Sequence, residues 1–199
     1  MPLFIDHLPL QHRIVSSAGR QTLAWYPLLP AMLTEAGLPE PPTDAPCRPW
    51  KFDTGCAPDA MAWRFHLERA GLDLADPRKL HSAKAIARLA NDAVEELPIR
   101  RASLWLVSNI PALRQSPFPL LLNPGLPFYA RFPRRRTNLF PLVGMSAFRR
   151  AGLTVKINFK AATLSVWTPG PWYRGWPVFA RRLLDGFART PFDRLCGGP

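Results

Sequence analysis

The chain has no long apolar run and very few cysteines. None of its 199 residues lies in a stretch that approaches the roughly 18–20 consecutive apolar residues of a membrane-spanning helix. The first residues lack a basic segment followed by an apolar block, so we expect no signal peptide. Cys47, Cys56 and Cys196 are odd in number and far apart, without a C-x-x-C pair or a Cys/His cluster at zinc-ligand spacing. We therefore expect free thiols in a reducing compartment, the cytoplasm.

Acidic residues are also scarce. The sequence has 14 Asp and Glu against 26 Lys and Arg, most of them arginine, and a formal net charge of +12. This balance can indicate contact with nucleic acid or acidic surfaces, but a general arginine bias on solvated faces explains the same numbers. The run Arg134–Arg136 fits either a solvated surface or a phosphate site. We expect no specific nucleic-acid partner and keep a basic nucleic-acid-binding protein as an alternative function.

Proline and tryptophan, by contrast, are abundant, with 24 and seven residues. So many prolines disfavour a helical bundle and favour short strands joined by fixed loops. Apolar residues make up 47% of the chain, enough for a sizeable core. The composition therefore predicts a mainly β fold in one domain with extensions.

Three parts follow from the order of the patterns. Residues 1–20 are polar without a clear period and predict an N-terminal arm, residues 21–170 form the domain, and residues 171–199 form a tail with an amphipathic helical pattern. The tail helix suits packing or dimerisation, or alternatively a membrane surface. Residues 23–33 are apolar but broken by proline, as in an edge strand, and residues 37–49 predict a loop.

Within the domain, a short strand over Trp50–Phe52 precedes a predicted helix from Pro58 to Ala70. Residues 84–107 predict a β-hairpin with its turn at Asn91 and Asp92. The first arm of that hairpin would equally suit a short helix. A second hairpin is predicted where apolar and polar residues alternate between 155 and 166.

The chemically most informative feature is the tripeptide Asp53-Thr54-Gly55, which directly follows the strand over Trp50–Phe52. On its own it is a weak signal, because Asp53 could simply cap the following turn. A second segment supports a different interpretation. Leu142-Val143-Gly144-Met145 is an apolar-apolar-glycine sequence followed by a short helical stretch, Ser146 to Arg150.

Together these two segments resemble the retroviral-type (retropepsin-like) aspartic proteases, in particular bacterial members, over roughly residues 23–168. The resemblance implies an acid-protease β-barrel with short helices, in which residues 142–145 cross behind the active-site turn. It also implies that the hairpin over residues 84–107 is a flap that closes over a peptide substrate. The substrate-binding residues at its tip would be Leu89, Ala90, Asn91 and Asp92.

The resemblance further implies an aspartic endopeptidase without a metal or cofactor. Two carboxylates about 3 Å apart share one proton, so that one activates a water and the other donates to the scissile carbonyl. Asp53 would be the acid/base, while Thr54 and Gly55 would build the turn. The chain has only one such tripeptide, so the second aspartate must come from another copy in a C2 homodimer.

Two further alternatives stay open. The same fold could serve as a non-catalytic module that binds peptides or proteins, since fold does not imply function. Cys56, directly after the tripeptide, could act as a nucleophile if His66 or His81 lay beside it in space, although a small packed thiol is the simpler interpretation.

Overall fold

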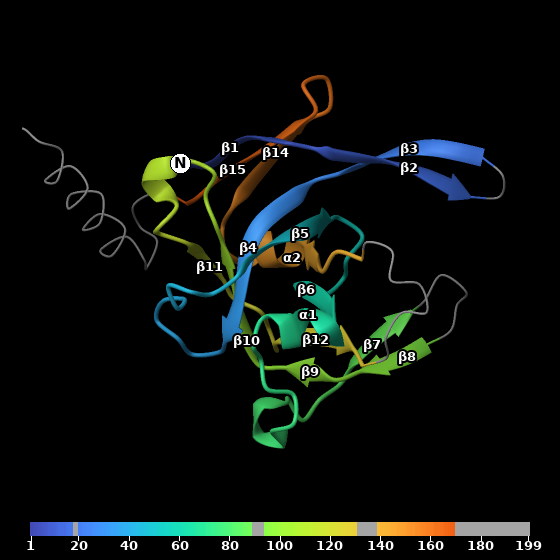
Figure 1. The fold of residues 1–199 in the computed structure, drawn as a ribbon, viewed down its shortest axis with the longest axis vertical. Helices are drawn as coiled ribbons and strands as arrows, with labels where there is room; N and C mark the ends of the chain where they lie inside the picture. Colours follow the sequence, from blue (N-terminus) through green and yellow to red (C-terminus); the bar gives the residue numbers. More distant parts are fainter. Residues whose placement is uncertain (18–19, 89–93, 131–138, 170–199) are drawn as a thin grey trace, which may run out of the picture.

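The computed structural model describes residues 1–17, 20–88, 94–130 and 139–169, and in them the chain is mainly β-structure (Figure 1). The largest sheet has eight strands: β4 (Leu28–Glu35), β5 (Cys47–Asp53), β6 (Ala60–Trp63), β9 (Ile99–Arg100), β10 (Ala102–Leu106), β11 (Phe118–Leu120), β12 (Leu126–Tyr129) and β13 (Leu142–Gly144). Their order is β11-β10-β4-β5-β13-β6-β12-β9. The mainly β prediction is confirmed. The described strands form a curled, open sheet, so the closed acid-protease barrel stays a prediction.

A smaller sheet joins the beginning of the chain to the end of its described part. It has the order β1-β15-β14, with β1 (Leu3–Pro9), β14 (Thr154–Asn158) and β15 (Thr163–Trp167). Phe4 and Ile5 of β1 are buried in the core. The expectation of an unpatterned arm over residues 1–20 is therefore wrong for β1. The apolar residues of β1 do not alternate regularly along the strand, so the sequence shows no period, but the strand pairs with β15 and buries two of them.

Two hairpins complete the β-structure. β2 (Gln11–Ser17) pairs with β3 (Arg20–Tyr26), and this hairpin extends away from the sheets (Figure 1). β7 (Ala85–Arg88) pairs with β8 (Val94–Leu97). The predicted hairpin is confirmed in its arms, and the helical alternative for its first arm is excluded. It is shorter than predicted, because residues 102–106 belong to the large sheet. The proposed tip, residues 89–92, lies outside the described residues.

The predicted second hairpin is confirmed as β14 and β15. Val155 and Ile157 are more buried than Thr154, Lys156 and Asn158, which are exposed, as the period of two in a strand requires.

The edge strand predicted from the prolines in residues 23–33 is wrong for β4, which is a central strand between β5 and β10. Pro30 faces Pro49 across the β4–β5 pair. The Pro30 carbonyl accepts from the Val107 amide, so the Pro30 nitrogen also faces the chain just after the last residue of β10. A proline, which has no N–H to donate, is tolerated in this central strand because β10 has already ended at this position.

The helix predicted from Pro58 begins only at Arg64, as α1 (Arg64–Arg69). Residues 60–63 form β6 instead, with Ala60 and Ala62 fully buried and the two residues between and after them partly exposed. This alternation overrides helix propensity because β6 pairs with β12 and β13. The predicted helix end is confirmed at Gly71, whose φ is +75°. The other short helices are η1 (Pro77–Lys79), η2 (Pro111–Leu113) and α2 (Met145–Arg150).

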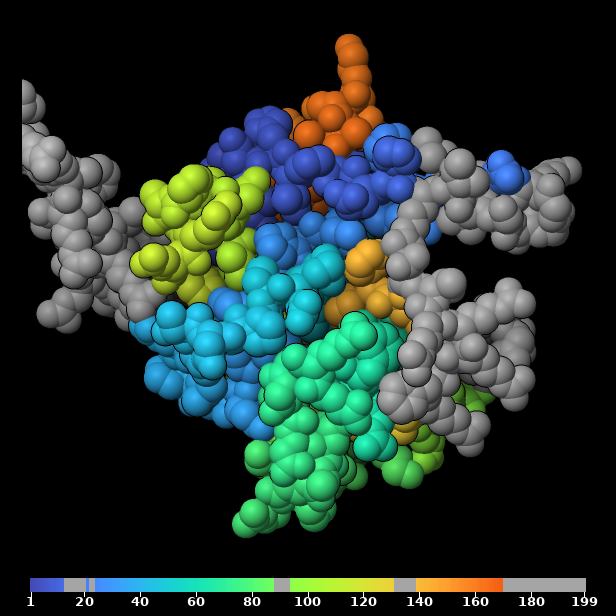
Figure 2. Space-filling view, viewed as in Figure 1, coloured from blue at the N-terminus to red at the C-terminus, as the bar shows by residue number. Residues whose placement is uncertain are grey.

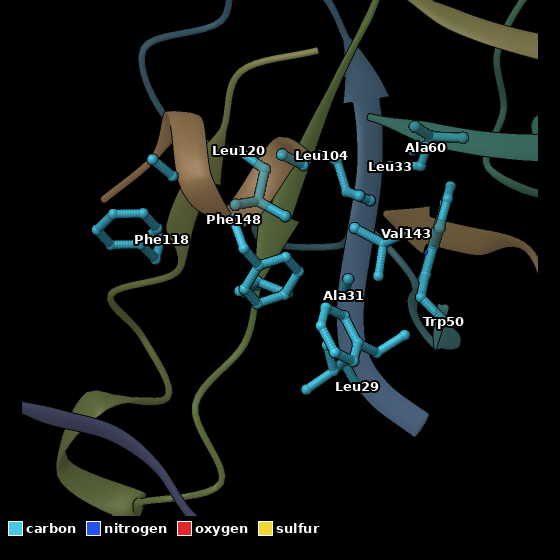
Figure 3. Packing of buried hydrophobic residues seen from close by; sticks show 14 of the residues in the cluster. Leu29, Ala31, Leu33, Trp50, Ala60, Leu104, Phe118, Leu120, Val143 and Phe148 are labelled. Carbon is cyan, nitrogen blue, oxygen red and sulfur yellow. The ribbon is translucent and has the colours of Figure 1, made fainter. Parts of the chain in front are cut away.

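The core is formed by the large sheet together with residues of the small sheet, α1 and α2, and Figure 3 shows the part beside α2. Phe52 at the end of β5 meets Phe148 of α2 edge to face, with ring centroids 4.9 Å apart. Trp50 and Val143 are also buried, at 2% and 0% exposure. Aromatic packing on the core side of β5 thus fixes the position of the strand end that carries Asp53.

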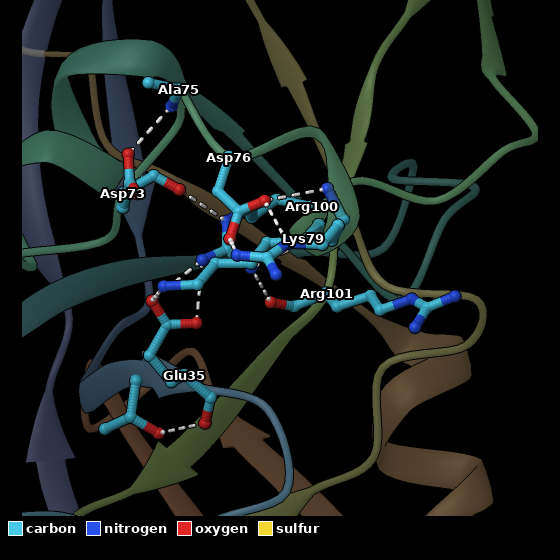
Figure 4. A network of polar contacts seen from close by, with 9 residues as sticks. Glu35, Asp73, Ala75, Asp76, Lys79, Arg100 and Arg101 are labelled. Atoms are coloured by element: carbon cyan, nitrogen blue, oxygen red, sulfur yellow. Dashed lines mark hydrogen bonds and ion pairs between the residues drawn. The ribbon is translucent and has the colours of Figure 1, made fainter.

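A buried arginine anchors the loop of residues 73–82, which projects at the lower end of the molecule (Figure 2). Arg100 is 1% exposed, and its guanidinium bonds both carboxylate oxygens of Glu35 at 2.8 and 2.7 Å. It also donates to the carbonyls of Asp73, Lys79 and Arg101 (Figure 4). One side chain therefore ties both ends of the loop to β4 and β9.

Several expectations fall on other parts of the chain. The run Arg134–Arg136 and the tail over residues 171–199 lie outside the described residues. In the described ranges, no helix has both the length and the apolar character to cross a membrane.

Candidate functional site

Asp53 is the last residue of β5, at the point where the chain leaves the large sheet. β13 runs parallel to β5, in a register that sets Leu142 opposite Lys51, Val143 opposite Phe52 and Gly144 opposite Asp53. The two sequence segments that predicted a site are thus neighbouring strands that end side by side. The short helix predicted over Ser146–Arg150 follows as α2.

The turn after β5 holds the Asp53 carboxylate in a fixed orientation. The Gly55 amide donates to Oδ1 at 2.9 Å, and the Cys56 amide donates to the Asp53 carbonyl at 3.2 Å. The Lys51 ammonium lies 3.0 Å from Oδ2. The Asp53 side chain is 27% exposed, and Thr54 and Gly55 are exposed. One carboxylate oxygen is therefore bound by the turn itself, and the other faces a cation near the surface.

These contacts determine the charge on Asp53. Partial burial acts to raise the pKa of this carboxyl, but hydrogen bonds from Lys51 and from the Gly55 amide, together with the positive charge of Lys51, outweigh it. The pKa of Asp53 therefore lies below its ordinary value. In a single chain the carboxylate is ionised at neutral pH and binds no proton that it could donate.

Gly144 passes directly behind this turn. Its amide donates to the Asp59 carbonyl at 2.8 Å. A Cβ at this position would lie 2.6 Å from the Cys56 carbonyl oxygen, and closer still to that of Pro58. Real Cβ atoms do not approach carbonyl oxygens this closely, so only glycine fits. The backbone of residues 56–59 is thus clamped against the end of β13.

A buried ion pair braces the same turn from α2. Asp59 is 3% exposed, and its Oδ1 accepts from Arg150 at 3.2 Å while its Oδ2 accepts from the Asn123 amide at 2.8 Å. Both carboxylate oxygens are satisfied, as a buried carboxylate requires. The contact connects the segment after the Asp-Thr-Gly turn to the helix that follows Gly144.

The β7–β8 hairpin lies beside β12. Tyr129, the last residue of β12, stacks on Trp63 with ring centroids 5.5 Å apart. Its pKa is raised, first by partial burial and then by the nearby groups of Glu95 and Cys56. β8 contacts β12, the strand that ends at Tyr129. The role of this hairpin as a flap stays a prediction.

Cys56 is not an activated nucleophile. The thiol is buried, at 8% exposure, and lies 3.5 Å from the Pro58 carbonyl oxygen. Burial, followed by the charges of Asp53 and Asp59, raises the pKa of Cys56 to about 12. Both histidines of the alternative hypothesis are hydrogen-bonded to the backbone instead of to Cys56. His66 bonds Trp63 N and Leu139 O, and His81 Nδ1 accepts from Ala83 N. Cys56 is a packed thiol, as the simpler interpretation held.

His66 gives a pH-dependent stability that can be measured. Burial lowers its pKa to about 4, against about 6.5 for an unfolded chain. Between these values the unfolded chain binds the extra proton, so the stabilisation present above pH 6.5 is lost as the pH falls toward 4. We expect the free energy of unfolding to fall by about 3 kcal/mol over this range from His66 alone.

In His66→Gln the side-chain amide of the glutamine can still donate to the Leu139 carbonyl and accept from the backbone N–H of Trp63, but it does not titrate. Urea denaturation at pH 7, 5.5 and 4 should show a flatter pH dependence for His66→Gln than for the wild type. His81→Gln, a change of the same type in a surface loop, is the matched control. An unchanged slope in His66→Gln would contradict the assignment.

The structure thus brings Asp53, Thr54 and Gly55 together in one turn, while Leu89, Ala90, Asn91 and Asp92 lie outside the described residues. Sequence reasoning missed the partner of Asp53, Lys51. The signal was present, because residues two apart in a strand point to the same face.

The described residues hold no cluster of three or more His, Cys, Asp or Glu side chains that could bind a metal ion. No family model, no curated protein and no solved structure matches this chain. A function has to be argued from the site itself.

Proposed function

We propose that this chain is an aspartic endopeptidase that acts as a homodimer, with a water activated between the Asp53 carboxylates of two copies. The observation that carries the proposal is the pairing of β5 with β13, which sets Gly144 opposite Asp53 and against the backbone of the next turn. Glycine at position 144 allows β13 to pack against the turn, and this packing makes the turn rigid. The turn then orients the Asp53 carboxylate, whose Oδ1 accepts from the Gly55 amide.

Further features support this proposal. The arms of the hairpin that we interpret as a flap are formed, and β8 contacts β12, the strand that pairs with β6 after the turn. Met145, the first residue of α2, is 53% exposed next to Gly144, so an apolar side chain is available beside the turn for a second copy. Cys47 and Cys56 are free thiols, which suits the cytoplasmic location that we propose.

The chemistry follows from bringing two such turns together. Two carboxylates at close range cannot both ionise, so the pair would hold one proton. The ionised member removes a proton from water, the water oxygen attacks the peptide carbonyl, and the protonated member donates to the carbonyl oxygen. In the collapse of this intermediate, the carboxyl that took the water proton gives it to the leaving nitrogen and the C–N bond breaks. The other carboxylate takes a proton from a hydroxyl of the intermediate, so the pair again holds one proton. Thr54 and Gly55 hold the geometry and do not enter the bond changes.

The test is hydrolysis of unfolded protein substrates by the purified chain across pH 4–8. Asp53→Asn keeps the shape of the side chain and removes its titration, so we expect activity to fall about a thousandfold or more. Asp44→Asn, in the exposed loop before β5, is the matched control and should keep full activity. Cleavage that survives Asp53→Asn would contradict the proposal.

The dimer requirement has a separate readout. After subunit exchange in an equal mixture of wild type and Asp53→Asn, only dimers of two wild-type chains are fully active. The mixture should therefore show about one quarter of the activity of wild type at the same total protein concentration. One half of that activity would indicate that each chain works alone. Sedimentation analysis of the same samples gives the oligomeric state.

A second candidate, a non-catalytic peptide-binding module, is favoured by one observation. Lys51 occupies Oδ2 of Asp53 and keeps that carboxylate ionised in the single chain. If this pair persists in the dimer, no proton is shared. Such a module would bind unfolded peptides without cleaving them, and Asp53→Asn would change neither the binding nor the integrity of the peptide.

A further inference from the structure

Lys51 is a charged side chain in direct contact with the proposed reactive carboxylate. It precedes Asp53 by two residues in β5, so both side chains point to the same face of the strand. The ammonium lies 3.0 Å from Asp53 Oδ2 and 5.1 Å from the centroid of the Tyr26 ring. Its side chain is 28% exposed. A cation is therefore held between a carboxylate and an aromatic face, at the edge of the site.

The contact conflicts with hydrolysis as long as it persists. The ammonium occupies the oxygen of Asp53 that the turn leaves free, since Oδ1 already accepts from the Gly55 amide. A substrate carbonyl or an attacking water needs access to this oxygen. An adjacent cation also favours the ionised form of the carboxylate, whereas the mechanism requires one proton for the pair. Lys51 has to leave Asp53 before the proposed chemistry can take place.

Moving this cation is costly unless another anion receives it. A partly buried ammonium that leaves its carboxylate without a new partner loses both the ion pair and a charge-assisted hydrogen bond. The Tyr26 ring supports a cation through its face but cannot replace a full negative charge. Asp59, the acidic residue at the end of the same turn, is already bonded by Arg150 and the Asn123 amide. A substrate that carries its own carboxylate would supply the compensating anion.

We propose that Lys51 selects substrates that carry an acidic side chain next to the scissile peptide bond. This inference rests on the proposed peptidase function and adds its specificity. The substrate carboxylate takes over the ammonium of Lys51, and the transfer frees Oδ2 of Asp53 for the shared proton. A neutral or basic side chain at the same place leaves Lys51 on Asp53, so such a peptide is bound weakly and cleaved slowly.

The experiment uses the full chain and a synthetic peptide library in which the residues on both sides of each bond vary, with the cleaved bonds identified by mass spectrometry. For the wild type we expect kcat/KM at least about tenfold higher for peptides with Asp or Glu beside the bond than for those with Asn or Gln. Lys51→Met should abolish this preference. Lys51→Glu should reverse it in favour of Lys and Arg, and Lys51→Arg should retain it.

Lys156→Met, on an exposed position of β14, is the matched control and should behave as the wild type. Cleavage that depends on Asp53 but shows no preference for acidic residues, or a preference that persists in Lys51→Met, would overturn the role of Lys51 and leave the peptidase standing. The absence of any cleavage that depends on Asp53 would overturn both. The reversed preference of Lys51→Glu is a gain, which a merely unfolded variant cannot produce.

Discussion

Alanine at position 144 should lower the free energy of unfolding by about 3 kcal/mol, at the upper end of the usual cost of overpacking. The added methyl group would lie 2.6 Å from the Cys56 carbonyl oxygen and still closer to that of Pro58. Both atoms belong to the backbone of a turn that is braced through Asp59, so neither can move without breaking the bonds that hold Asp53 in place. Urea denaturation followed by circular dichroism measures the loss.

Gly37→Ala separates this steric effect from the backbone preference of glycine. Gly37 has a φ of +84° and nothing within 4 Å of an added Cβ, so its replacement should cost only about 1 kcal/mol of left-handed strain. Gly144 has a φ of −90°, which alanine adopts freely. Equal losses for the two variants would mean that the close approach of β13 to the turn is wrong.

Methionine in place of Arg100 should also cost about 3 kcal/mol. The guanidinium is 1% exposed and bonds Glu35 and the carbonyls of Asp73, Lys79 and Arg101. Its removal leaves three backbone carbonyls and one carboxylate without this partner. The value lies at the low end of the range for broken buried pairs, because the Glu35 side chain is 36% exposed and water can partly replace the arginine.

Arg78→Met provides the matched control. Arg78 also pairs with a carboxylate, Asp76, but its side chain is 88% exposed. We expect the urea midpoint of this variant to equal that of the wild type. If Arg100→Met is as mild as Arg78→Met, the loop of residues 73–82 does not depend on its buried anchor. Limited proteolysis gives a second readout, since in Arg100→Met the loop should be cut faster.

Local patterns predicted several elements near the site correctly, namely the strand before Asp53, the short helix over Ser146–Arg150 and the final hairpin. The hairpin shows its alternation of apolar and polar residues within ten or so residues. The turn at Asp53 needed no tertiary information, because a strand followed by Asp, Thr and Gly already contains the donor and the acceptor of its own hydrogen bond.

The rest depended on partners distant in sequence. Ala60–Trp63 looks helical until β12 and β13 provide backbone partners on both sides. Leu28–Glu35 looks like an edge strand until the pairing shows where its prolines point. Arg100 gives no sequence signal of burial, because three of its five acceptor atoms are backbone carbonyls whose position only the fold determines. Burial of a charge is a property of the assembled chain.

The pairing of β1 with β15 has a consequence for how the protein is made. Residues 3–9 are synthesised long before residues 163–167, which form their partner strand. Until then Phe4 and Ile5, fully shielded in the finished molecule, are exposed on the nascent chain. The large sheet can assemble earlier, since it uses none of these residues. Closure by the first strand should therefore be a late step of folding, and a chain truncated before residue 163 should aggregate through its own beginning.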